Sequence, residues 1–375
     1  MRMDFQRFTR VSSRSFLWVA NVTVGLMLIF SAYGGIIDPR TWVGGALVAM
    51  TFPLWLAITP ALAVVNLMIY RRALIVNAVS LLLCAGPLFT YCPINISSAP
   101  DAGSSGTDSV FTLLTYNVFD FMYHDRAYHG DVPNVTISYI IKADADIVCL
   151  QEAAHMNPLE QWHFDRSQVD SVKRLYPYTL INDKIGLAVL SKVPVDSVSL
   201  PKGCFDFNRT SDFQAYTLNM KGRQLTIFNV HFQSIGLTPE DRDLYRRITG
   251  ASLHRRELDN VGSIFISKLA RAYCLRADQA EYLSQMLRAT SGNVIVAGDF
   301  NDIPDCHAMR AIEDEGFTDV YSEVGFGPGV TYHANRFYFR IDNILYRGDM
   351  RAVGVERATL KSSDHYPLLA TFKWK

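Results

Sequence analysis

The sequence lacks three features that would each have pointed to a function. Its six cysteines include no CxxC pair, which excludes a zinc cluster of the usual spacing. Its net charge is zero, and without a basic excess it does not resemble a dedicated nucleic-acid binder. Three long stretches near the N-terminus contain no charged residue and no histidine. A transport or proton-relay role needs ionisable residues inside membrane spans and therefore finds no support.

The same uncharged stretches predict a membrane anchor. They cover residues 16–37, 41–70 and 73–92. Each is at least as long as the roughly 20 residues that a helix needs to cross a bilayer. We therefore expect three transmembrane helices within residues 1–92, the second kinked by prolines. The alternative is a cleaved signal peptide followed by buried core helices, but the first stretch is long for a signal sequence and two more follow it.

Charges that flank these stretches predict the orientation of the anchor. Four arginines precede the first stretch and Arg71 and Arg72 follow the second, whereas the turn between them offers only Asp38 and Arg40. By the positive-inside rule, the N-terminus and the second loop lie in the cytoplasm. Three crossings then place the rest of the chain in the periplasm or outside the cell. Residues 93–109 are rich in Pro, Ser and Gly and are expected to form a flexible linker.

From residue 110 the pattern changes to short apolar runs separated by turn residues. Many of the runs are rich in β-branched residues, which favours strands. Strands are predicted at residues 111–118, 146–150, 186–191, 195–200, 215–220, 224–231, 294–300, 340–346 and 368–374. Helices are predicted at residues 135–143 and 261–289. Residues 110–375 are therefore expected to form a layered α/β domain with sheets at its centre.

Polar side chains suited to metal ligation or proton transfer lie in or beside the ends of these strands. The set consists of Asn117, Glu152, His231, Asp299, Asn301, Asp342, Asp364 and His365. Burying such groups unpaired costs several kcal/mol, so a cation, a charged partner or water must compensate them. If the strands of two packed sheets end at one edge, these side chains converge on a single site.

Each of these residues also has a purely structural interpretation. Glu152 could begin a helix, and Asp299 and Asn301 could form a turn. Either histidine could be a satisfied core residue, and the asparagine could cap the end of the first strand. Asp342 could pair with Arg340. For these interpretations to hold together, every motif would have to be coincidental, so we favour the shared site.

The ordered motifs resemble those of the endonuclease/exonuclease/phosphatase superfamily, over residues 110–375. They are Asn117, Gln151-Glu152, Asn229-Val230-His231, Gly298-Asp299-Phe300-Asn301, Arg340-Ile341-Asp342 and Ser363-Asp364-His365. The superfamily includes pancreatic-type deoxyribonucleases, abasic-site endonucleases, inositol-polyphosphate phosphatases and neutral sphingomyelinases. The resemblance implies a four-layered α/β sandwich, in which two packed, mainly antiparallel sheets are flanked by helices. Here the three transmembrane helices precede that sandwich.

The resemblance further implies a divalent-metal-dependent hydrolase of phosphate esters, a phosphodiesterase or a phosphatase. Glu152 would be the principal metal ligand, assisted by Asn117 and Asp364. Hard oxygen ligands suit Mg²⁺, and Mn²⁺ is the other candidate. The sequence does not decide between one cation and two.

Catalytic roles in this resemblance fall on the remaining residues. Asp299 would align or deprotonate the metal-activated water that attacks phosphorus, while Asn301 would hold a phosphate oxygen. His231 would donate to the scissile phosphate or protonate the leaving group. His365 would be the acid/base or phosphate-contacting histidine, oriented by Asp342 or by its neighbouring aspartate.

The predicted partners are the lipid bilayer and a phosphate-ester substrate, with no protein partner. The substrate would be a phospholipid headgroup, an inositol phosphate or a nucleic acid. Residues 93–375 hold 29 basic and 34 acidic residues, and this acidic balance favours lipid or small esters over DNA. A non-specific extracytoplasmic nuclease is the second candidate, and a non-catalytic membrane-tethered binding module of the same fold is the third. Eight basic residues between 242 and 276 form either a solvated helix face or a contact for an anionic headgroup.

Overall fold

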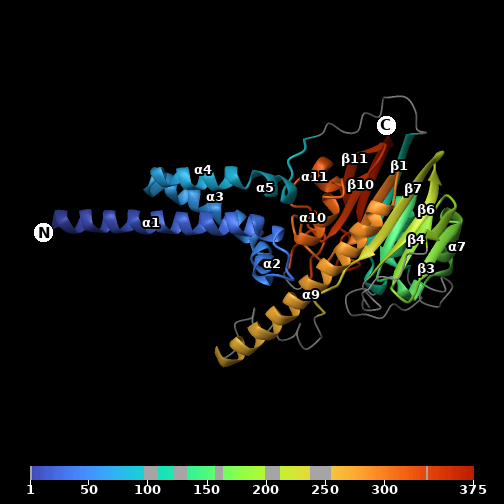
Figure 1. Ribbon diagram of the computed structural model, residues 1–375, viewed down its shortest axis with the longest axis horizontal. Helices are drawn as coiled ribbons and strands as arrows, with labels where there is room; N and C mark the ends of the chain where they lie inside the picture. The colour runs from blue at the N-terminus through green and yellow to red at the C-terminus, as the bar shows by residue number, and fades with distance from the viewer. Residues whose placement is uncertain are drawn as a thin grey trace. The chain divides into compact units, whose positions relative to one another are not determined.

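The computed structural model describes residues 2–96, 109–121, 133–156, 164–198, 212–236, 255–334 and 337–375. The chain divides into two compact units. The N-terminal unit consists mainly of residues 1–91, and the C-terminal unit mainly of residues 92–375. In Figure 1 the first is built of helices, and the second of two sheets with helices outside them. Residues 97–108 of the predicted linker lie outside the described residues.

Helices make up the N-terminal unit. Its elements are α1 (Arg2–Tyr33), η1 (Gly34–Ile36), α2 (Val43–Ala49), α3 (Phe52–Ile69), η2 (Arg71–Ala73), α4 (Leu74–Leu83) and α5 (Ala85–Tyr91). Two stretches, Ser13–Ile36 and Phe52–Ile69, are long and apolar enough to cross a membrane. The helices between Arg71 and Tyr91 are bent by 67° and provide a third span only if the bent pair crosses as one. The N-terminal unit therefore has two or three candidate spans.

Breaks divide the second and third predicted spans. A short break separates α2 from α3, so residues 41–70 form two helices. Pro53 lies in the first turn of α3, where a backbone N–H would have no acceptor within the helix, so proline costs no hydrogen bond there. Pro60 lies inside the same helix. Pro87 accounts for the bend between α4 and α5, because its ring excludes the carbonyl of Leu83 and it cannot donate a hydrogen bond.

Three buried asparagines join α1, α3 and α4, and we call Asn21, Asn66 and Asn77 the amide cluster. Asn21 Nδ2 donates to Asn66 Oδ1 at 3.1 Å, and Asn66 Nδ2 donates back to Asn21 Oδ1 at 2.7 Å. Asn66 Nδ2 also donates to Asn77 Oδ1 at 2.9 Å, and Asn21 Nδ2 to the carbonyl of Leu17 at 2.7 Å. The amides thus satisfy one another across three helices.

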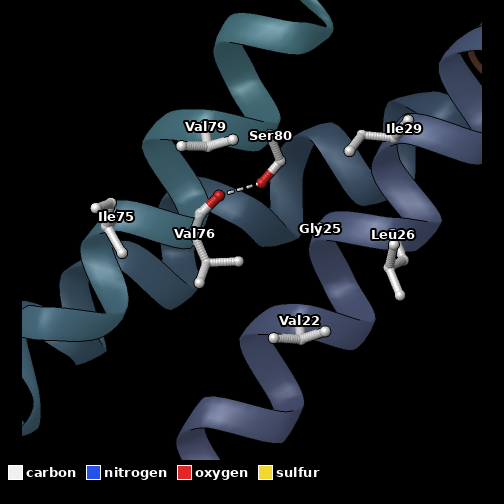
Figure 2. Close-up of a pocket in the computed structure, with 8 residues that line it drawn as sticks. All are labelled: Val22, Gly25, Leu26, Ile29, Ile75, Val76, Val79 and Ser80. Carbon is white, nitrogen blue, oxygen red and sulfur yellow. Dashed lines mark hydrogen bonds between the residues drawn. The ribbon is translucent and has the colours of Figure 1, made fainter.

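Between α1 and α4 lies an apolar groove of about 240 Å³ (Figure 2). It is lined by Val22, Gly25, Leu26 and Ile29 of α1 and by Ile75, Val76, Val79 and Ser80 of α4. Glycine at position 25 permits the close approach of the helices, since a Cβ there would lie 3.0 Å from Ser80 Oγ. The Ser80 hydroxyl donates to the carbonyl of Val76 within α4, so it does not need a partner in the groove.

The C-terminal unit is built on two six-stranded sheets. The first has the order β11 (Met350–Arg357), β12 (Leu368–Trp374), β1 (Val110–Asn117), β2 (Ile147–Gln151), β4 (Leu187–Ser191) and β3 (Tyr178–Asn182). The second has the order β5 (Val195–Val198), β6 (Asp212–Met220), β7 (Arg223–His231), β8 (Asn293–Asp299), β10 (Asp342–Arg347) and β9 (Thr318–Asp319). In each sheet one central pair is parallel, β1 with β2 and β7 with β8, and the other pairs are antiparallel.

Alternate side chains of the strands face two different cores. Leu113 of β1 points between the sheets and belongs to a buried cluster with Ile295 of β8. Its neighbour Leu114 points to the outer face and packs in a second cluster with Ile137 and Val169, which come from two helices. This period of two is the pattern of a strand buried on both faces.

Helices cover the outer faces of both sheets (Figure 1). They are α6 (Val135–Ala143) and α7 (Arg166–Leu175) on the first sheet, and α9 (Arg255–Ala289) and α10 (His307–Glu313) on the second. Short helices connect the strands at η4 (Phe119–Phe121), η5 (Ala154–Met156) and α11 (Val320–Val324). Phe213 of β6 contacts Tyr282 of α9 with their ring centroids 5.3 Å apart. The layers of helices, sheet, sheet and helices confirm the predicted four-layered sandwich.

Candidate active site

The predicted site residues lie at one edge of the two sheets. The parallel strands β1 and β2 end there together, at Asn117 and directly before Glu152. The parallel strands β7 and β8 end together at His231 and Asp299. Strand β10 runs antiparallel to β8 and begins at this edge with Asp342, opposite Asp299. The topology therefore brings together side chains that are far apart in the sequence.

Tight backbone geometry holds these strand ends in place. A Cβ on Gly298 would lie 1.9 Å from the carbonyl oxygen of Val230, so only glycine fits before Asp299. Glu152 and Asn301 have φ angles of 51° and 52°, in the left-handed region that residues other than glycine seldom adopt. Such a conformation costs about 1–3 kcal/mol and persists only where the surroundings impose it.

One amide links the two carboxylates at the centre of the site. Asn117 Nδ2 lies 3.0 Å from both Glu152 Oε1 and Asp299 Oδ2. Its Oδ1 accepts from the backbone N–H of Phe119 at 3.1 Å, so the amide presents its N–H groups to the carboxylates. Asp299 also accepts from the backbone N–H of Asn301 at 2.7 Å and from its Nδ2 at 3.2 Å. Asn117 and Asn301 thus fix the orientation of Asp299.

His365 lies among three carboxylates. Its Nδ1 is 2.7 Å from Asp342 Oδ2, and its Nε2 is 3.7 Å from Asp299 Oδ2 and 4.0 Å from Asp364 Oδ1. Burial by itself lowers the pKa of His365, but the charges of the three aspartates outweigh it and raise the pKa well above 6.5. Burial raises the pKa of Asp299 and of Asp364, and the nearby imidazole opposes both shifts. The three aspartates therefore favour the protonated form of His365 in the absence of a cation.

Several buried atoms of the site have no hydrogen-bond partner among the described residues. They are both ring nitrogens of His231 and Oδ1 of Asp342. His231 Nε2 lies 3.6 Å from Glu152 Oε1 and 3.8 Å from Asp299 Oδ2, beyond hydrogen-bond distance. Leaving a buried polar atom unsatisfied costs about 1–3 kcal/mol. Such an arrangement is expected where a ligand supplies the missing partners.

We call the charged part of this site the acid–histidine cluster, which consists of Glu152, Asp299, Asp342, Asp364, His231 and His365. The side chain of Glu152 is 36% exposed and that of Asp364 is 18% exposed, whereas Asp299 and Asp342 are buried. One ligand atom from each of Asp299, Asp342 and His365 lies within 4.8 Å of the others. The donor set and its unpaired atoms fit a divalent cation, which would reach Glu152 and Asp364 from solvent.

Other motif residues lie behind the site. Gln151 Nε2 donates to Asn229 Oδ1 at 2.7 Å, and Asn229 Nδ2 donates to two backbone carbonyls of the first sheet. This bridge joins the two sheets. Arg340 is completely buried and binds Asp319 at 2.7 Å. The alternative in which Arg340 pairs with Asp342 is therefore wrong.

Arg276 has a role that the sequence analysis did not find. It is buried in α9, where its Nη1 donates to the carbonyl of Asn301 at 2.6 Å and its Nε lies 3.2 Å from Asp302 Oδ2. It therefore holds the chain beyond Asp299, and the two proposed roles, a solvated helix face or an anion contact, do not apply to it. Its position on the buried face of the helix, four residues from Ala272 and Ala280, was the available signal. Outside the described side chains lie Arg242, Arg246, Arg247, Arg255 and Arg256.

Two hydroxyl groups hold the loops of the site. Thr331 Oγ1 accepts from the backbone N–H of Asp342 at 3.0 Å. Ser363 Oγ donates to the carbonyl of Asn117 at 2.7 Å and accepts from the backbone N–H of His365 at 3.1 Å. Ser363 belongs to a motif that the sequence singles out, whereas no local pattern distinguishes Thr331.

Comparisons with known proteins agree with this architecture. Residues 114–365 match the model of the Endonuclease/Exonuclease/phosphatase family, and residues 14–91 match a family described only as a domain of unknown function. No curated protein matches the sequence.

Solved structures of similar fold have low sequence identity to the chain. An endonuclease/exonuclease/phosphatase from Beutenbergia cavernae is 16% identical with a TM-score of 0.49, covering 71% of this chain and 72% of that one. One from Bacteroides vulgatus is 15% identical with a TM-score of 0.44, covering 71% and 100%. A beta toxin from Staphylococcus aureus is 17% identical with a TM-score of 0.40, covering 69% and 99%.

Proposed function

Because the chain belongs to the endonuclease/exonuclease/phosphatase family, we propose that it is a membrane-anchored, divalent-metal-dependent hydrolase of phosphate esters. The observation that carries the proposal is the acid–histidine cluster, in which side chains from the ends of four strands and from the loop before β12 approach one another within 4 Å. Some of their buried atoms have no partner among the described residues, which favours a ligand-binding role over a structural one.

We propose that Glu152, Asn117 and Asp364 hold Mg²⁺ or Mn²⁺. Two of the three are exposed enough to meet a hydrated cation, which keeps several of its waters in such sites. Ligation through Asn117 Oδ1 requires the amide to turn and release the N–H of Phe119. The buried group Asp299, Asp342 and His365 fits a cation less well, because two of its members already bind each other at 2.7 Å.

When bound, the cation supplies positive charge that neutralises the phosphate oxygens. Asp342 fixes the ring of His365 through Nδ1 and leaves Nε2 directed at Asp299, so His365 is suited to contact a phosphate oxygen or to act as acid or base. His231 has both nitrogens available and is suited to donate to the scissile phosphate or to the leaving group.

Asp299 is suited to orient or deprotonate the attacking water. Its carboxylate is held by Asn117 and Asn301, and its burial raises its pKa, which strengthens it as a base. Asn301 donates through Nδ2 to the carbonyl of Phe232 at 2.9 Å, so a contact with a phosphate oxygen would replace that bond.

The substrate class is tested with the purified full-length chain against plasmid DNA, RNA, sphingomyelin, phosphoinositides and soluble phosphomonoesters. Each is assayed with Mg²⁺ and with chelator, for wild type, Asp299→Asn and the control Asp196→Asn, which changes an exposed acid on β5. We expect Mg²⁺-dependent cleavage of a lipid headgroup or a small ester, lost in Asp299→Asn only. Cleavage confined to nucleic acid would identify a nuclease, and no cleavage of any substrate would favour a binding module.

We further propose that the N-terminus is cytoplasmic and that the C-terminal unit lies outside the cytoplasm. Arg71 and Arg72, which follow the second candidate span, support this orientation. An even number of crossings would instead return the C-terminal unit to the cytoplasm. Protease added to sealed vesicles of known orientation distinguishes the two cases by whether the C-terminal unit is degraded.

A further inference from the structure

The residues directly after α5 pair with a glycine-rich loop of the C-terminal unit. Gly327 N donates to the carbonyl of Pro93 at 2.8 Å. Ile94 lies opposite Phe326 in an antiparallel bridge. The start of the predicted linker is therefore bound to the folded domain by main-chain pairing.

Side chains alternate along this short extended segment. Asn95 points to the domain, where its Nδ2 donates to the carbonyls of Ser322 and Gly325 at 3.0 Å each. Ile94 and Ile96, on either side of it, are 58% and 86% exposed. The polar residue thus serves as the anchor and the apolar residues face outward, which reverses the usual arrangement of an edge strand.

The glycine-rich loop is constructed to hold Phe326 outward. A Cβ on Gly325 would lie 2.4 Å from the carbonyl oxygen of Tyr321, and one on Gly329 2.4 Å from the Tyr321 ring. The Tyr321 hydroxyl donates to the carbonyl of Phe326 at 2.8 Å. The backbone is therefore fixed against Tyr321, while the Phe326 side chain is 67% exposed.

We call Ile94, Ile96 and Phe326 the apolar patch. A single exposed apolar side chain is ordinary on a protein surface. Here three exposed apolar side chains lie on two paired segments whose backbones are held by hydrogen bonds, which favours a common role for them. Burying each such side chain contributes about 1.5–3 kcal/mol, so a partner that covers the patch would gain a substantial free energy.

We propose that the apolar patch inserts into the lipid surface of the membrane that the N-terminal unit crosses. Ile94 follows the last residue of α5, Tyr91, by three positions, and three residues of extended chain span at most about 11 Å. The covalent chain therefore keeps the patch close to the point where the third apolar segment ends. This inference rests on the membrane anchoring proposed above and does not depend on catalysis.

Two other occupants fit the patch less well. Residues 97–108 contain no aromatic and no branched aliphatic residue, so the remainder of the linker cannot cover it with apolar surface. A second copy of the chain would need an interface of roughly 800 Å² per partner, far more than three side chains provide. A lipid surface needs no such complementarity, because hydrocarbon adapts to the shape of the inserted side chains.

The test uses the full-length chain, one copy per phospholipid nanodisc, with a single trifluoromethyl-phenylalanine at position 326. Fluorine NMR measures relaxation by a lipid nitroxide near the headgroups and by a soluble gadolinium chelate. The matched control carries the label in place of Tyr178, an aromatic residue 40% exposed on the edge strand β3. A second control carries it in place of Phe30, inside the first candidate span.

We expect relaxation of the 326 label by the lipid nitroxide to be severalfold stronger than that of the 178 label, with the reverse order for the soluble chelate. Ile94→Glu should reduce the lipid effect at position 326, because a carboxylate is expelled from the interface. If the Phe30 label responds to lipid but the 326 label behaves like the 178 label, the patch does not touch the bilayer. A Phe30 label that shows no relaxation by the lipid nitroxide would contradict the proposed membrane anchoring as well. Protection from the chelate without lipid relaxation would indicate another occupant and contradict the proposal.

Discussion

The amide cluster of the N-terminal unit and the acid–histidine cluster of the C-terminal unit are both buried and polar, but they are satisfied differently. In the first, Asn21 and Asn66 exchange hydrogen bonds and Asn77 accepts another, without any charge. In the second, charged groups crowd together, and His231 and Asp342 keep atoms without partners among the described residues. A cluster that holds helices together completes its own hydrogen bonds, whereas one that serves a ligand leaves some of them open.

The largest effect is expected when Asp299 is changed to Asn. Loss of a positioned base lowers the rate of hydrolysis by about 10²–10⁴-fold. Stability should not fall, because a neutral amide is easier to bury than a carboxylate. The ratio kcat/KM and the melting temperature in chelator measure the two effects. Asp196→Asn should leave both unchanged, and a large drop in melting temperature for Asp299→Asn would assign that residue a structural role.

Arg276 borders the site, but we expect it to stabilise the fold, because it is buried beside Asp302 and donates to the carbonyl of Asn301. Replacing it with Met removes the counterion of Asp302 and should destabilise the C-terminal unit by about 3–5 kcal/mol. Urea denaturation measures this change, and Arg271→Met, which alters an exposed residue of the same helix, is the control. Equal midpoints for the two variants would contradict the assignment.

A third prediction concerns pH and the cation. The pKa values of His365, Asp299 and Asp364 are raised in the folded, metal-free protein, so the folded state binds protons more tightly than the unfolded state. The stability from His365 is fully present below its unfolded pKa of about 6.5 and is lost as pH rises through the higher folded value.

Mg²⁺ should offset that loss by taking the place of the bound protons. At a hundred times its dissociation constant, a ligand stabilises the folded state by about 2.7 kcal/mol. The gap between melting temperatures in Mg²⁺ and in chelator should therefore widen as the pH rises above about 6.5, the unfolded pKa of histidine. A constant gap, or the same pH slope in Asp342→Asn, would argue against the assignment.

The smallest effect is expected in the amide cluster. Asn66→Leu removes hydrogen bonds between three helices and should destabilise the N-terminal unit by about 1–2 kcal/mol, without changing hydrolysis of a soluble substrate. Unfolding in detergent micelles measures the change. Thr59→Val is the matched control, because the Thr59 hydroxyl is buried but donates only within α3, to the carbonyl of Trp55. Loss of hydrolysis in Asn66→Leu would contradict the purely structural role of the amide cluster.

Strand prediction succeeded at the centres of the sheets, but of the four edge strands it found only β5. The unpredicted strands β3, β9 and β11 lie at edges, whereas every predicted strand has a counterpart in the structure. An edge strand is exposed on one side and tolerates polar residues, such as Arg351 and Glu356 in β11, which hide its apolar pattern. The helix predicted at residues 135–143 coincides with α6, because Asn134 caps it and the buried face is strongly periodic.

The site was predictable in composition but not in its contacts. Polar residues at apolar strand ends marked the candidates, and the resemblance ordered them. The partner of His365 was not decided between Asp342 and Asp364, because only the pairing of β10 with β8 brings Asp342 to the ring. The buried role of Arg276 likewise depends on how α9 packs, which no local pattern encodes.

The neighbouring positions of β1 and β12, with Val110 opposite Lys373, have a consequence for biosynthesis. The ribosome synthesises residues 1–92 first and then β1, whose parallel partner β2 follows soon but whose antiparallel partner β12 emerges only after most of the remaining domain. His365 precedes β12 by only a few residues. The acid–histidine cluster is therefore complete only once His365 has been synthesised, and a chain truncated before that residue would lack it.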